Sequence, residues 1–168
     1  MKKSFFASLL TAASIAVGAI TVAAAEPPPK PAVPPARLEE AKERYVERGI
    51  AGLDVGLRIA KKPGLSPEQL EKVRPAFRKW VDDELVPFLT RNDLLNDWIE
   101  MQFDKDVERL HLESLHAANL GDVLTIAQET VDLTRKRWPK VVSKMGTPEW
   151  HQLQQSLQVS MMRILEEK

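Results

Sequence analysis

The sequence predicts an all-α protein, a five-helix bundle-like domain with one long central helix, preceded by a signal peptide and a proline-rich linker. Two observations carry this prediction. From Arg37 onward, apolar residues recur at every third or fourth position, which is the spacing of an amphipathic helix. No stretch alternates apolar and polar residues for long enough to form a β-strand. Residues that end and begin helices divide the pattern into segments.

The first 25 residues have the three-part order of a secretory signal peptide. Lys2 and Lys3 precede an apolar run over residues 5–22, and three alanines then lead to Glu26. The apolar run could marginally span a bilayer, but the small residues that follow it favour cleavage between Ala25 and Glu26. We therefore expect a periplasmic or secreted protein with no stable membrane span after cleavage.

Residues 26–36 form the expected linker, because they contain half of the 12 prolines in the chain. Such a segment favours extended polyproline II structure and serves as a spacer rather than as a ligand for a proline-recognition domain. Residues 37–168 then form a single helical domain.

Composition excludes several classes of function. The whole chain has 24 basic and 24 acidic residues without a basic cluster, which argues against nucleic acid as a partner. It has no cysteine, which excludes disulfides and thiolate chemistry. Non-covalent packing alone must hold the fold.

Five helical segments are expected, over residues 37–62, from 67 to a turn at 87–92, over 94–118, from 123 to 138, and from 149 to 165. Lys61-Lys62-Pro63-Gly64 ends the first helix. Ser66 fits the N-cap of the second, Pro67 its first position, and Gln69 would complete a capping box. Pro75 should kink this helix, and Pro87 should mark its end.

The central helix carries an acidic stripe, since five acidic residues fall in one narrow sector: Asp93, Asp97, Glu100, Asp104 and Glu108. Past Lys105 the apolar face rotates and encloses His111. The helix therefore bends near 104–106 or changes its packing partner. Each of the last four helices also has one tryptophan, which favours aromatic residues in a bundle core over a ligand-binding aromatic box.

Two Glu-x-x-His motifs, Glu108 to His111 and Glu113 to His116, have the spacing by which helical bundles hold metals. Both lie on one helix and point in different directions, so they cannot share an ion. Glu108 and His111, extended by Asp104 and a ligand from another helix, could hold Zn or Cu weakly. A b-type haem bound by Met and His is a further alternative.

Catalytic motifs are missing: the chain has neither Gly-x-Ser-x-Gly nor His-Glu-x-x-His. We therefore expect no catalysis and no resident cofactor.

The segment Leu65-Ser66-Pro67-Glu68-Gln69 resembles the LTxxQ motif of periplasmic stress proteins of the CpxP and Spy type, with Ser in place of Thr. Those proteins have the motif twice, whereas the second candidate here, over residues 145–150, lacks both the leucine and the glutamine. The resemblance implies a cradle of helices, a chaperone-like or envelope-stress role, and a possible homodimer.

These observations together predict an exported helical protein that binds a protein partner or an unfolded polypeptide. The alternative is a metal- or haem-binding bundle centred on His111.

Overall fold

The computed structural model describes residues 33–166, and the secondary structure of this part of the chain consists of helices joined by short loops, without a strand. The all-α prediction is confirmed. The predicted signal peptide and most of the predicted linker lie outside the described residues and remain predictions.

The five expected segments divide into more helices than predicted. Along the described chain they are α2 (Pro35–Ile59), α3 (Pro67–Trp80), the π-helical turn η1 (Val81–Leu85), α4 (Val86–Arg91), α5 (Leu95–Phe103), α6 (Lys105–Leu115), α7 (Leu120–Arg137), α8 (Pro139–Met145) and α9 (Pro148–Glu166). The helices α3, η1 and α4 follow one another without a gap, so the second predicted helix is one rod that ends at Arg91.

The expected long central helix is two helices, α5 and α6, because Asp104 interrupts it. The backbone of Asp104 is extended, with φ −74° and ψ 129°. Its side-chain Oδ1 accepts hydrogen bonds from the backbone N–H groups of Asp106 (2.9 Å) and Val107 (3.1 Å). Asp104 is therefore an N-cap that begins α6, and of the two alternatives that the rotating apolar face left open, the helix breaks near residues 104–106.

The two prolines of this rod lie inside helices. The helix α3 continues through the exposed Pro75, and α4 includes Pro87 and ends at Arg91, so the turn lies at the later part of the predicted 87–92 step and not at Pro87 itself. Pro87 has no N–H to donate, and its ring would crowd the carbonyl of Asp83 in a regular helix. The wider turn of η1, in which the N–H of Val86 bonds to the carbonyl of Val81, lies immediately before Pro87 and accommodates it.

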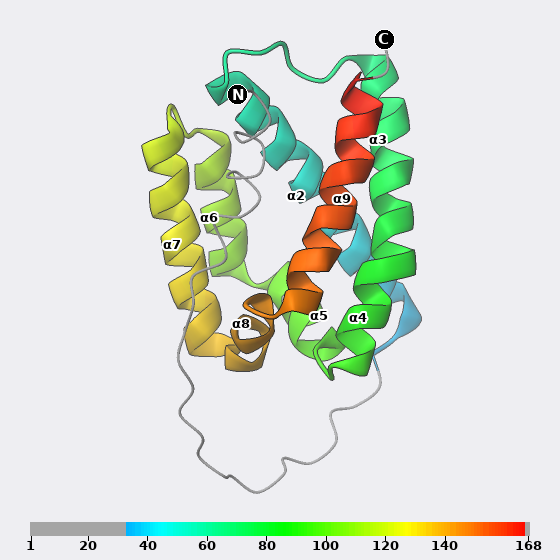
Figure 1. Ribbon diagram of the computed structural model, residues 1–168. Coiled ribbons are helices and arrows are strands. Elements are labelled where there is room, and N and C mark those ends of the chain that lie inside the picture. Colours follow the sequence, from blue (N-terminus) through cyan, green and yellow to red (C-terminus); the bar gives the residue numbers. More distant parts are fainter. Residues whose placement is uncertain (1–32, 167–168) are drawn as a thin grey trace, which may run out of the picture.

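The helix α2 runs obliquely between two helical pairs (Figure 1). The helices α3 and α9 pack together on one side of it, and α6 and α7 on the other. Helices α5 and α8 lie toward one end.

The main hydrophobic core draws its buried residues from α2 as far as Ile50, from α3 through α5, and from α8 and α9. Trp80, Trp98 and Trp138 are buried in it, and Trp150 packs against it. Tyr45 of α2 joins the aromatic contacts, with its ring centroid 5.9 Å from Phe77 and 5.4 Å from Trp98. The tryptophans thus act as core residues, as the sequence predicted.

Candidate functional site

His111 lies half-buried on α6, at the side that packs on α2. Burial and the positive charge of nearby Arg48 lower the pKa of His111, and the carboxylate of Glu108 opposes them. The imidazole is therefore held in its neutral form at pH 7.

Arg48 of α2 links three helices at this point. Its Nη1 donates to Oε1 of Gln102 on α5 (3.3 Å), and Nε2 of Gln102 donates to the carbonyl of Trp98 (3.2 Å). Burial lowers the pKa of Arg48, and the charge of Glu108 on α6 raises it. Sequence reasoning missed Arg48 and Gln102, because no local spacing shows that these two residues, 54 positions apart, are hydrogen-bonded.

Glu108 and His111 lie about one turn apart on α6, and no third ligand joins them among the residues that the structure describes. Within residues 33–166, no group of three or more His, Cys, Asp or Glu side chains could hold a metal ion. Asp104, the expected third ligand, caps α6 and binds Arg137 instead. The charge of Arg48 also opposes a cation at His111.

The second Glu-x-x-His motif has separate local roles. Glu113 accepts a hydrogen bond from Arg109 (2.6 Å), and Nδ1 of the exposed His116 lies 3.0 Å from the carbonyl oxygen of Leu112. The two motifs do not converge, as the sequence predicted.

The acidic stripe is not continuous, because the bend at Asp104 divides it between α5 and α6. Glu100 accepts a hydrogen bond from the indole of Trp138 (3.4 Å), and Asp104 binds Arg137. Asp93, Glu100 and Glu108 are exposed, whereas Asp97 and Asp104 are partly buried, so the acidic residues form a largely solvated face with some pairing between helices.

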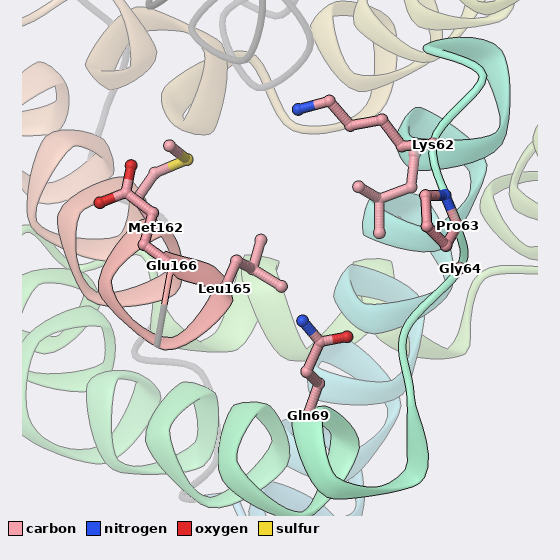
Figure 2. Close-up of a pocket in the computed structure, with 8 residues that line it drawn as sticks. Lys62, Pro63, Gly64, Gln69, Met162, Leu165 and Glu166 are labelled. Atoms are coloured by element: carbon pink, nitrogen blue, oxygen red, sulfur yellow. The ribbon is translucent and has the colours of Figure 1, made fainter. Parts of the chain in front are cut away.

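A cavity of about 290 Å³ lies between the end of α9, the loop after α2 and the start of α3 (Figure 2). Its lining is Leu57, Lys62, Pro63, Gly64, Gln69, Met162, Leu165 and Glu166. The side chain of Leu165 points into the opening from α9, across from Gln69 on α3.

The segment that resembles the LTxxQ motif forms part of this site. The Oγ of Ser66 accepts a hydrogen bond from the backbone N–H of Gln69 (3.2 Å), and Oε1 of Gln69 accepts one from the backbone N–H of Ser66 (2.9 Å). The predicted capping box is confirmed. It fixes Gln69 at the cavity and directs the amide nitrogen of its side chain toward the opening (Figure 2).

The loop between α2 and α3, which forms another wall of the cavity, is also held in place. The backbone N–H of Leu65 donates to Oδ1 of Asp54 (3.3 Å), which ties the loop back to α2. The sequence did not predict this cavity, because its walls come from segments about one hundred residues apart in the chain.

In comparisons with known proteins, no family model, no curated protein and no solved structure matches this chain. None of the helices in residues 33–166 has the length and apolar character needed to cross a membrane.

Proposed function

We propose that this chain is an exported, non-enzymatic helical protein that binds a segment of a protein partner or of an unfolded polypeptide. The observation that carries the proposal is the cavity between α9 and the α2–α3 loop. The expected export and the resemblance of residues 65–69 to the LTxxQ motif support a chaperone-like or envelope-stress role.

The size and lining of the cavity suit a peptide side chain. Leu57, Pro63, Met162 and Leu165 provide apolar contacts. Sites for small ligands and cofactors span roughly 300–1,000 Å³, so this cavity, at about 290 Å³, suits one or two side chains better than a haem.

The polar groups at the cavity can bind the backbone of the peptide whose side chain enters it. The Gln69 amide nitrogen can donate a hydrogen bond to a peptide carbonyl. Lys62 and Glu166 bring opposite charges to the lining, which suits a segment that carries both donors and acceptors.

A cavity variant tests this proposal against a matched surface variant. Leu165→Asp places a charge in the cavity, whereas Val159→Asp places the same charge on the same helix, at a residue that is 59% exposed and does not line it. The probe is a fluorescent model protein kept unfolded by alkylation of its reduced cysteines, and binding is measured by fluorescence anisotropy.

We expect Leu165→Asp to weaken binding roughly tenfold or more, because a leucine contact contributes about 1.5–3 kcal/mol and tenfold in affinity corresponds to about 1.4 kcal/mol. Val159→Asp should bind like the original protein, and both variants should keep the original circular dichroism spectrum. Equal binding by both variants, or no binding by the original protein, would reject the proposal.

A further inference from the structure

Helices α6 and α7 form an antiparallel pair, the arm, over residues 105–137, along one side of the molecule (Figure 1). The arm has four buried residues: Leu110, Ala117, Val131 and Thr134. None of them belongs to the main hydrophobic core, to which the arm contributes only the partly buried Val107. The arm therefore shares little apolar packing with the rest of the fold.

Both ends of the arm coincide with breaks in the helical backbone. Asp104 is extended before α6, and Trp138, with φ −132° and ψ 63°, separates α7 from α8. Arg137 donates hydrogen bonds to both Asp104 and Asp106, so the two breaks lie next to each other. Two adjacent breaks at the base of a rigid helical pair have the geometry of a hinge.

Hydrogen bonds attach the end of the arm that lies away from Asp104 and Trp138 to α2. Nη2 of Arg58 donates to the backbone carbonyls of Leu115 (2.7 Å) and Ala117 (3.1 Å), which are orphan acceptors at the end of α6. Nearer the base, Arg48 interacts electrostatically with Glu108 and His111.

The arm covers an apolar part of α2. Val55 lies between Arg48 and Arg58 on the same face of that helix, as their spacing of seven and three residues requires. Val55 is 6% exposed and Leu110 of α6 is 2% exposed, yet neither belongs to the main core. Val55 and Leu110 lie on two helices that pack on each other, α2 and α6, and both are buried outside the main core.

We propose that the arm is a hinged cover, which rotates about Asp104 and Trp138, is held closed by Arg58, and uncovers the second half of α2 when it opens. Opening breaks the Arg58 contacts and exposes Val55 and Leu110, which are buried outside the main core, while the main core stays intact. Partial opening then needs less free energy than global unfolding, as for other locally unfolding units. This inference is independent of the proposed polypeptide binding, because it concerns the motion of the isolated protein.

Amide hydrogen exchange of the full chain, read by mass spectrometry, tests the hinge. Arg58→Ala removes the fastening, and Arg74→Ala is the matched control because it removes a side-chain pair with Glu47 between α2 and α3. We expect Arg58→Ala to speed exchange in residues 105–137 about fivefold to tenfold, the effect of losing a hydrogen bond of typical net strength at an exposed side chain, with no change in α3 or α9. Arg74→Ala should leave the exchange of the arm unchanged.

Exchange that rises equally in the arm, α3 and α9 in Arg58→Ala would overturn the proposal, because the arm would then unfold with the core. Arm exchange that responds as strongly to Arg74→Ala would overturn it as well.

The distance between two spin labels provides a second test of the hinge. Because the chain has no native cysteine, spin labels can be attached at Leu124→Cys on the arm and Glu71→Cys on α3, both exposed positions. The hinge predicts that Arg58→Ala adds a second, different label–label distance. A single narrow distance that Arg58→Ala leaves unchanged would contradict it.

Discussion

Two glycines of α2, Gly49 and Gly52, have opposite surroundings. A Cβ on Gly49 would collide with the ring of the buried Phe77, whereas one on Gly52 would meet nothing within 4 Å. At Gly49, the absence of a side chain allows α2 and α3 to pack closely, which offsets the poor helix propensity of glycine.

The two alanine substitutions should therefore change stability in opposite directions. We expect Gly49→Ala to lower the free energy of unfolding by about 1–3 kcal/mol through overpacking, reduced by the better helix propensity of alanine. Gly52→Ala should raise it by up to about 1 kcal/mol. Urea unfolding followed by tryptophan fluorescence measures both, and a stabilising Gly49→Ala would contradict the close α2–α3 contact.

Tyr45 should resist ionisation. Burial raises the pKa of Tyr45 to about 12, while its ring packs edge-on against Phe77 and Trp98. A raised pKa in the folded state means that this stabilising contribution is complete below pH 10 and is lost as the pH rises toward 12. Tyr45 is the only tyrosine in the chain, so an absorbance titration follows it alone. Ionisation with a midpoint near pH 10 in the folded protein would contradict the prediction.

His111 should make the protein less stable in weak acid. Burial and Arg48 lower the pKa of His111, so the unfolded chain binds this proton more readily than the folded one. The free energy of unfolding should fall as the pH drops below about 6.5, the pKa of an unperturbed histidine. His111→Gln should remove part of this fall, whereas His116→Gln, at an exposed histidine, should not. Urea unfolding between pH 7 and pH 5 measures the free energy of unfolding of both variants. An identical dependence of this free energy on pH in the two variants would contradict the prediction for His111.

At the scale of helices, the start of α3 depends on Ser66. Ser66→Ala removes the acceptor for the N–H of Gln69 and should cost about 1 kcal/mol, whereas Ser66→Thr keeps a capping hydroxyl and should cost less. Thermal unfolding of both variants checks this. Ser66→Ala with unchanged stability would show that the capping box does not hold the start of α3.

The bend between α5 and α6 shows what a periodic pattern can predict. The apolar face rotates past Lys105, which indicated a change of direction, but the pattern alone left a bend and a change of packing partner as alternatives. The structure decided between them: Asp104, a residue type that favours the N-cap position, begins α6 inside what the sequence predicted as one helix. At Pro87 the same approach failed, because the π-helical turn η1 compensates for a residue that usually ends a helix.

At the scale of the whole protein, the predicted export can be tested directly. Expression of the full chain in a Gram-negative bacterium should give a periplasmic protein whose N-terminal sequence begins at Glu26, because Ala23 and Ala25 fit the small-residue cleavage positions. Chemical sequencing of the purified protein determines its N-terminal residues. A periplasmic product that keeps residues 1–25 would contradict cleavage and indicate an anchor instead.

The sequence by itself determined the helical class, the capping box at Ser66 and the core character of the tryptophans, because each depends on residues within a few positions of one another. Tertiary structure decided the rest. The surroundings of His111, the cavity at Leu165 and the fastening of the arm by Arg58 all join helices distant in the chain. Helical periodicity gives the apolar face of each helix but not its packing partner, so Arg48 of α2 could be placed beside Gln102 of α5 and His111 of α6 only once the helices were packed.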